Sequence, residues 1–276
     1  MAEYVIRGNC NTQAVILPEK GATVISLKKG DQEFLYCDQE NLLSPERPRC
    51  GIPYIFPAFG RLKDGKYTWN GTEYAMGIHG FAHTSPWKVS RYAEDSLELV
   101  LESNETTLAQ YPFPFKVTLN FLVKDSTLTI SQTYENTGIE PMPYNYGFHP
   151  YFLTEKPEDI RVEASAAMRL DFVAGQIPFG HKTIQVAIPE GAPESGACLL
   201  GVKSPTVLYD PGKEKRLTMS FDDSFPCHVL WAQAGKPFLC VEPVNGGADS
   251  LNTGSYLTLA PGETKAAVVS FKVENI

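Results

Sequence analysis

Two ionisable side chains lie in sequence contexts that would hold them in place. His149 lies in YNYGFHPYF (144–152), among aromatic residues, a glycine and a proline, and Glu242 follows four apolar residues in FLCVEP (238–243). An imidazole can release or accept a proton near neutral pH, and a carboxylate becomes a useful base when apolar surroundings raise its pKa. An acid and a base of this kind can together move two protons on one substrate.

Each of these stretches also has a purely structural interpretation. A histidine beside aromatic residues is often a hydrogen-bonded core residue, and a buried carboxylate is usually paired because an unpaired buried charge is costly. Arg61, which follows a glycine in FPAFGRLKDG (56–65), could be a surface loop cation, and His79 in GIHGFAH (77–83) could be a packing residue. Taken singly, none of the stretches decides between structure and chemistry.

Recurrent β-rich segments predict the elements that would position these residues. The stretch KDGKYTWNGTEYAM carries Asp64-Gly65 and Asn70-Gly71, pairs that tolerate positive φ and close β-hairpins. Runs such as SLELVLES, FKVTLNFLV, STLTISQTY and AAVVSFKV recur about every ten residues. Glycine and proline interrupt helical periodicity throughout. We therefore expect an all-β fold of mainly antiparallel sheets in a single domain, residues 1–276, because all-β chains of more than roughly 200 residues commonly form one domain.

Composition limits the partners and the location of the protein. With 24 Lys+Arg against 32 Asp+Glu, the net charge of -8 repels the phosphates of nucleic acids and anionic lipids and favours a small or neutral partner. No stretch approaches the roughly 18 apolar residues of a membrane helix, and no basic region followed by an apolar run opens the chain. We therefore expect a cytoplasmic protein that binds neither nucleic acid nor membrane.

The cysteines and the missing cofactor signatures favour chemistry carried by side chains alone. The 6 cysteines are widely spaced, without a CxxC pair or a Cys/His cluster at zinc spacing, and we interpret them as reduced packing residues. The sequence contains neither a P-loop nor a GxGxxG turn. We expect no metal and no cofactor.

The four stretches occur in an order that resembles a known family. FPAFGRLKDG, GIHGFAH, YNYGFHPYF and FLCVEPVNGGADSLN together resemble the galactose mutarotase-like superfamily of aldose 1-epimerases, and within it the LacX-like and hexose-6-phosphate mutarotase branch. The resemblance runs over nearly the whole chain. It implies a β-supersandwich of large antiparallel sheets with the sugar site on a concave face.

The resemblance also implies residue roles. By motif, His149 would be the general acid, Glu242 the general base, and Arg61 and His79 substrate-binding groups, in a cofactor-independent isomerase that interconverts the α- and β-anomers of a hexose or related aldose. Removing the C1 hydroxyl proton while protonating the ring oxygen opens the ring, so an acid and a base must act together. Trp231 is a further candidate, for stacking on the sugar.

Two features depart from the family pattern. Where related sugar-phosphate mutarotases resemble HGFAR, this chain reads HGFAH, so that His83 replaces an arginine that would help to bind phosphate. Lys63 and His83, together with Arg61, could still form a weaker anion site. Family members also carry an acidic residue between the histidine and glutamate motifs, where Glu190 and Glu194 are the nearby acids and neither is assigned.

Three alternatives remain open at this point. A hexose-6-phosphate mutarotase would use the same acid and base on a phosphorylated sugar. A noncatalytic carbohydrate-binding protein on the same fold would not need both groups. A glycoside hydrolase would need two carboxylates at a defined separation, and only Glu242 lies in such a context. The sequence specifies neither the sugar nor the oligomeric state.

Overall fold

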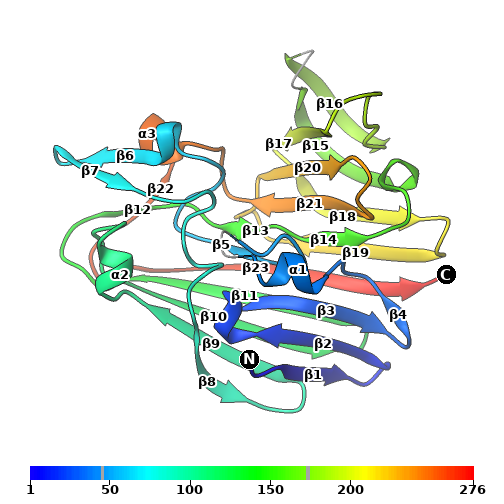
Figure 1. Cartoon of the computed structure of the whole chain (residues 1–276), viewed down its shortest axis with the longest axis horizontal. Coiled ribbons are helices and arrows are strands. Elements are labelled where there is room, and N and C mark those ends of the chain that lie inside the picture. Colours follow the sequence, from blue (N-terminus) through cyan, green and yellow to red (C-terminus); the bar gives the residue numbers. More distant parts are fainter. Residues whose placement is uncertain (45–46, 172–174) are drawn as a thin grey trace.

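The structure is a computed structural model that describes residues 1–44, 47–171 and 175–276, and it is built mainly of antiparallel strands (Figure 1). The strands of the large sheet are β5 (Tyr54–Ile55), β8 (Lys88–Tyr92), β9 (Ser96–Glu102), β10 (Phe115–Lys124), β11 (Thr127–Asn136), β13 (Gly147–Phe148), β14 (Tyr151–Leu153), β15 (Arg161–Asp171), β16 (Gly175–Ile184), β17 (Glu194–Leu200), β18 (Lys203–Asp210), β19 (Lys215–Phe221), β20 (Cys227–Gln233), β21 (Phe238–Val244) and β23 (Thr264–Asn275). Their order is β5-β13-β21-β20-β17-β15-β18-β19-β23-β11-β10-β9-β8, with β14 paired to β21 and β16 to β15. The expected all-β architecture of large antiparallel sheets is confirmed.

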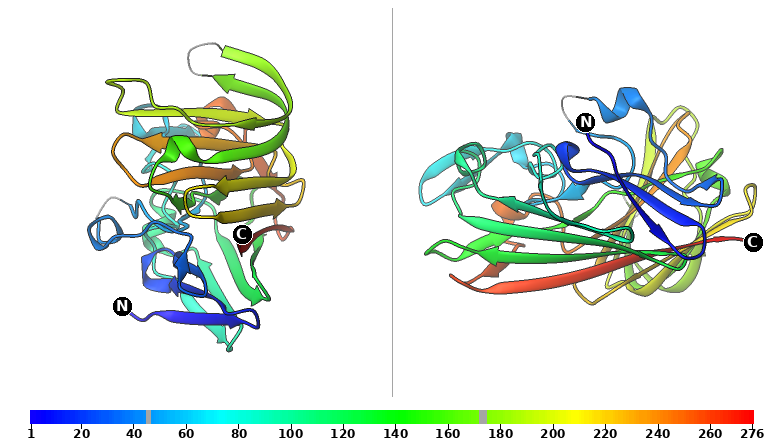
Figure 2. Two further views of the ribbon diagram at one scale, coloured as in Figure 1. Left: turned by 90° about the vertical axis from the view of Figure 1, so that its right-hand side faces the viewer. Right: turned by 90° about the horizontal axis from the view of Figure 1, so that it is seen from below.

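Smaller sheets and short helices complete the fold. A second sheet has the order β1 (Tyr4–Gly8), β2 (Thr12–Leu17), β3 (Thr23–Lys29), β4 (Gln32–Glu33), and it lies across β9, β10 and β23 (Figure 2). The remaining strands pair as β6 (Lys66–Trp69) with β7 (Thr72–Ala75) and β12 (Met142–Tyr144) with β22 (Leu257–Leu259). The α-helical segments are α1 (Gln39–Leu42), α2 (Glu105–Leu108) and α3 (Ser250–Thr253), and 3-10 turns span Pro18–Lys20, Lys63–Gly65 and Pro157–Asp159.

Alternation along the strands explains why the sheets pack face to face. In β10 and β11, buried residues alternate with partly or fully exposed ones, so that the paired residues Phe121 and Ile130 lie side by side on the buried face of the sheet. This period of two is the one that a strand with a single buried face requires. Aromatic rings fill the core between the layers, with Phe56 and Phe115 at 5.1 Å and Tyr134 and Tyr146 at 4.5 Å between ring centroids.

The two predicted turns take different forms. Asn70 and Gly71 adopt φ values of 47° and 79° and join β6 to β7 as the sequence predicts. Asp64 and Gly65 also have positive φ, but they lead into β6 from a loop and close no hairpin, which corrects the expectation. The dipeptide signals the conformation of the backbone, and strands are needed on both sides before that conformation makes a hairpin.

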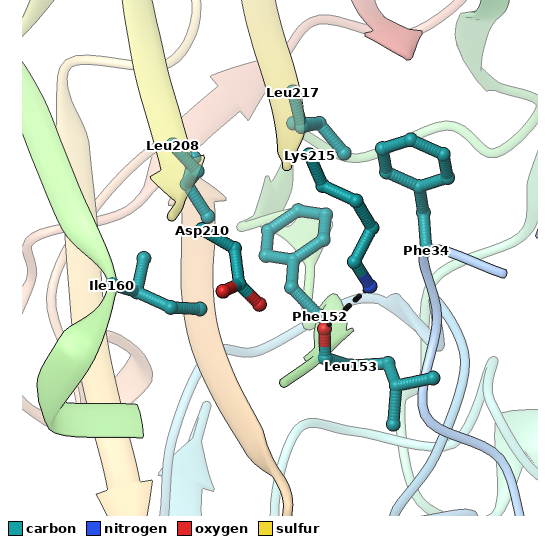
Figure 3. A pocket seen from close by; sticks show the side chains of 8 residues that line it. All are labelled: Phe34, Phe152, Leu153, Ile160, Leu208, Asp210, Lys215 and Leu217. Atoms are coloured by element: carbon teal, nitrogen blue, oxygen red, sulfur yellow. Dashed lines mark hydrogen bonds between the residues drawn. The ribbon is translucent and has the colours of Figure 1, made fainter. Parts of the chain in front are cut away.

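A buried lysine ties the second sheet to the large one. Lys215 Nζ donates hydrogen bonds to the carbonyl oxygens of Leu153 (Figure 3) and Glu33, at 3.0 Å each, and lies 5.4 Å from the centre of the Phe34 ring. Burial lowers the pKa of this ammonium group. The contacts connect the start of β19 with β4 and β14, and β14 pairs with β21, the strand that carries Glu242.

The strand β21 is the element on which those candidates depend. All of its residues are buried, and it pairs with β20 along one edge and with β13 and β14 along the other. Gly147 is opposite Val244 and Tyr151 is opposite Cys240. The same antiparallel register places His149, between the two short strands, opposite Glu242.

Gly147→Ala should destabilise the fold by about 1–3 kcal/mol, because an added Cβ would lie 2.6 Å from the Pro243 carbonyl oxygen and would overpack the β13–β21 pairing. Gly247→Ala is the matched control, since a Cβ there meets nothing within 4 Å. Urea unfolding of the two variants measures the difference. Equal stabilities would contradict the close approach of the two strands.

Candidate active site

His149 and Glu242 meet in the buried end of an open pocket. His149 Nε2 lies 3.4 Å from Glu242 Oε1, and the two residues are 6% and 3% exposed. In an antiparallel pair, opposite residues point to the same face of the sheet, so the register of β21 accounts for the contact. The Tyr151 ring stacks on the His149 imidazole at 4.7 Å between centroids and restricts its orientation.

His79 approaches this pair from a loop. The backbone φ of His79 is 64°, an unusual value for histidine, and its backbone N–H donates to the Gly60 carbonyl oxygen at 2.9 Å. The Gly60 N–H in turn donates to His79 Nδ1 at 3.1 Å. Because Nδ1 accepts, the proton of the neutral ring belongs on Nε2, which makes that nitrogen a donor. The His79 and His149 rings are 5.3 Å apart and perpendicular.

The pocket has a volume of about 400 Å³, enough for a monosaccharide. It brings together His149, Glu242, Arg61 and His79, as the motifs predict, and Trp231 lies on its wall. The full lining is Arg47, Arg49, Phe59, Arg61, Ile78, His79, His149, Glu194, Val229, Leu230, Trp231, Gln233 and Glu242. Residues more than 180 positions apart in the chain therefore share one cavity.

Trp231 and Glu194 form one side of the pocket. The Trp231 indole Nε1–H donates to Glu194 Oε2 at 3.1 Å, and the indole ring is perpendicular to the His149 ring at 6.0 Å between centroids. Glu194 is one of the two acids that the sequence left unassigned. Its carboxylate can accept hydrogen bonds from sugar hydroxyls, and it occupies the chain segment where an acidic residue was sought.

Arg47 and Arg49 are pocket residues that the sequence did not indicate. They lie between α1 and β5, in a stretch without periodicity, and only the path of the chain brings them to the pocket. Arg47 also lines a small hollow beside His83 and His149. Within the described part of the chain, its Nη1 is buried without a hydrogen-bond partner. The one signal in the sequence is two arginines directly before the apolar run CGIPYIF.

His83 and Lys63, the further candidates for an anion site, do not line the pocket with Arg61. His83 is buried behind the pocket with its ring 6.5 Å from that of His79, and burial lowers its pKa to about 4. Lys63 lines a separate surface hollow with Asp64 and Asp249. The geometry thus separates these two residues from Arg61, with which the sequence grouped them.

Burial sets the protonation of the His149–Glu242 pair. It raises the pKa of Glu242 to about 8, although the positive charge of Arg47 acts in the opposite direction. Burial also lowers the pKa of His149 well below its ordinary value, and the Arg47 charge adds to that effect. Near neutral pH the pair therefore holds one proton, on the carboxyl group. The raised carboxyl pKa agrees with the sequence-based expectation, whereas the proton expected on the His149 imidazole lies on the Glu242 carboxyl group.

The sequence resembles those of known proteins over nearly its whole length. The sequence matches the family described as aldose 1-epimerase over residues 3–272. The chain belongs to the aldose 1-epimerase family. The family and its LacX-like branch, which the ordered motifs predicted, are confirmed.

Relatives of this aldose 1-epimerase family member extend over most of its length. The protein LacX of Lactococcus lactis is 26% identical over 89% of both chains. The structure of Slr1438 from Synechocystis sp. PCC 6803 is 28% identical, with a TM-score of 0.89 over 100% of this chain and 96% of the other. A galactose mutarotase related enzyme of Lactobacillus acidophilus, 24% identical with a TM-score of 0.85 over 99% of this chain and 97% of the other, shares the fold.

The described residues contain neither a candidate membrane-spanning helix nor a candidate metal cluster. No helix among them has the length and hydropathy to span a membrane. No group of three or more His, Cys, Asp or Glu residues among them is arranged to hold a metal ion.

Glu242→Gln should change how the stability of the protein depends on pH. Because the folded-state pKa of about 8 exceeds the ordinary 4.5, the native state holds more protons than the unfolded chain between these values and loses stability as the pH rises through them. The lowered pKa of His149 has the opposite effect, but only below about pH 6.5. Urea unfolding should show the wild type losing about 2 kcal/mol relative to Glu242→Gln between about pH 6.5 and 8. A difference independent of pH would contradict the raised pKa.

Proposed function

We propose that this protein is a mutarotase that interconverts the α- and β-anomers of an aldose, with His149 and Glu242 as its proton-transfer groups. The observation that supports this most directly is the 3.4 Å contact of the two side chains at the buried end of a pocket that Arg61 and His79 also line. Membership of the aldose 1-epimerase family supports an isomerase-type activity. The substrate and the roles of individual residues are the part that we add.

The reaction needs one proton on the pair. His149 gives a proton to the ring oxygen while Glu242 takes the proton of the C1 hydroxyl, so that the bond from C1 to the ring oxygen breaks and an aldehyde forms. Rotation about the C1–C2 bond presents the other face of the carbonyl. The reverse transfers then close the ring as the other anomer, and the pair regains its starting protonation.

The pKa shifts of His149 and Glu242 indicate which step of the reaction needs assistance from the bound sugar. Ring opening converts protonated His149 and ionised Glu242 into neutral His149 and protonated Glu242, which is the form that burial favours. The starting form is therefore reached only when the bound sugar supplies hydrogen bonds in place of water. Arg61 and the Nε2–H of His79 are the donors that we assign to the sugar oxygens, where negative charge develops.

His149→Asn and Glu242→Gln should each lower the rate of mutarotation at least about 100-fold with little loss of fold, because each removes one proton-transfer group. Exchange between anomers of α-glucose and α-galactose, followed by NMR, measures the rate. The exposed pair of His181 and Glu163, at 3.1 Å, offers matched controls in His181→Asn and Glu163→Gln, which should keep full activity. Near-normal turnover by either pocket variant would refute the role of that residue.

The same assay separates the other classes. A protein that binds sugars without accelerating their exchange would be a noncatalytic carbohydrate-binding protein. Because Glu194 supplies a second carboxylate to the pocket, incubation with disaccharides is included, and release of a free reducing sugar would favour a hydrolase.

A sugar that carries an acidic group is the second candidate substrate. Arg47, Arg49 and Arg61 line the pocket together, and a guanidinium group binds phosphate or carboxylate through paired hydrogen bonds. Arg47 Nη1 has no partner among the described residues, so an anionic ligand would satisfy it. This arrangement supports a hexose-6-phosphate mutarotase despite the histidine at position 83.

Arg49→Gln should raise the KM for glucose 6-phosphate about 10-fold and change the KM for glucose little, because it removes a charge-assisted hydrogen bond to the phosphate alone. Lys63→Gln is the matched control, since Lys63 lines a separate hollow. Initial rates of anomer exchange with the two sugars provide the comparison. Equal effects of Arg49→Gln on both sugars would exclude a phosphate-specific role.

A further inference from the structure

Two thiols lie in contact where the chain enters and leaves the segment that carries the pocket arginines. Cys37 Sγ is 2.9 Å from Cys50 Sγ. The Gly51 N–H donates to the Tyr36 carbonyl oxygen at 2.7 Å, so the two chain ends are also joined through the backbone beside the thiols. Cys50 is fully buried, whereas Cys37 is partly exposed.

The segment between the two cysteines leads directly to the pocket. Asp38 caps α1, its side chain accepting a hydrogen bond from the Asn41 N–H at 2.7 Å. Arg47 and Arg49 follow α1 and line the pocket before the chain returns at Cys50. Any constraint on the ends of this segment therefore acts on the two arginines.

We propose that Cys37 and Cys50 are a redox modification site, at which a reversible disulfide restrains the segment carrying Arg47 and Arg49 and thereby strengthens the binding of acidic sugars. The effect on binding rests on the proposed function of the pocket, whereas the formation of the disulfide does not.

Formation of the disulfide requires little movement of the two cysteines. A disulfide has a sulfur–sulfur distance of about 2.05 Å, so the two sulfur atoms have to approach by less than about 1 Å from their present contact. The backbone hydrogen bond between Tyr36 and Gly51 already holds the neighbouring residues together.

The chemistry balances with a small-molecule disulfide as the oxidant. The Cys37 thiolate attacks one sulfur of the oxidant, which forms a mixed disulfide and releases one thiolate. The Cys50 thiol then loses its proton and attacks the Cys37 sulfur, which releases the second thiolate. The two protein thiols lose two electrons and two protons, the oxidant gains both electrons, and the protons end on the released thiols.

Exposure determines which thiol reacts first. The hydrogen bond with Cys37 and burial both raise the pKa of Cys50, which keeps it a thiol in the reduced protein. Cys37 is the thiol that solvent and oxidant can reach. Cys50 then reacts within the protein, where its neighbour is already in contact.

A second thiol pair provides the control. Cys198 and Cys227 lie on the neighbouring strands β17 and β20, which pair along their whole length. A cross-link there would join strands that the ladder already holds in register. It would not restrain the segment with Arg47 and Arg49.

The first experiment identifies the bond. The full-length protein is incubated with oxidised glutathione, free thiols are alkylated, and the digested protein is analysed by mass spectrometry. We expect a peptide cross-linked between Cys37 and Cys50 that dithiothreitol removes. Alkylation of both residues after oxidation, or a stable glutathione adduct on Cys37, would overturn the proposal.

The second experiment measures what the bond does. Oxidation should raise Tm by about 5 °C, because it closes a short loop in the unfolded chain, and Cys37→Ser should abolish the shift while Cys198→Ser keeps it. It should also lower the Kd for glucose 6-phosphate about 3-fold and leave the Kd for glucose unchanged, because the arginines are held in place. A disulfide that left both Kd values unchanged would refute the effect on binding. A protein that turned over neither sugar but showed both shifts would refute the mutarotase function and leave this proposal standing.

Discussion

The pairing of β21 with β13 and β14 is the constraint on which the rest of the site depends. Its register places His149 opposite Glu242 and gives both side chains the same face of the sheet. A slip of one residue would turn Glu242 to the other face and leave a carboxyl group in the core without its partner. The close approach of Gly147 to Pro243 and Val244, together with the seven buried residues of β21, makes such a slip costly.

Sharing one proton explains how so apolar a strand tolerates the pair. A buried carboxylate and a buried imidazolium would each be costly by themselves, whereas a protonated carboxyl beside a neutral imidazole carries no charge. The His149–Glu242 pair therefore stays in its uncharged form near neutral pH. The same low polarity that keeps the pair neutral would strengthen its hydrogen bonds to a sugar that displaces water.

Local sequence patterns predicted the strands, because the alternation along a strand and the conformation of a turn follow from short-range chemistry. The alternation in β10 and β11 and the Asn70-Gly71 turn depend on residues close in the chain, and four ordered motifs identified the family. Arg47 and Arg49 were missed, and Glu194 was named without a role, because their places in the pocket depend on how a loop and the start of β17 come together in the folded chain. Lys63 was grouped with Arg61 because it lies only two positions further along the chain. In the structure Lys63 lines a different surface hollow, next to the turn at Asp64.

The distribution of charge on the protein affects extended polyanions and a small anion in the pocket differently. The chain as a whole has a net charge of -8, which repels extended polyanions. The pocket wall, in contrast, presents Arg47, Arg49 and Arg61, and burial keeps the carboxyl of Glu242 protonated and hence uncharged near neutral pH. Because charges beyond about 8–10 Å are largely screened at physiological salt, a small anion inside the pocket experiences the arginines more than the distant surface. This distribution of charge supports the proposal that the pocket takes a sugar with a single acidic group.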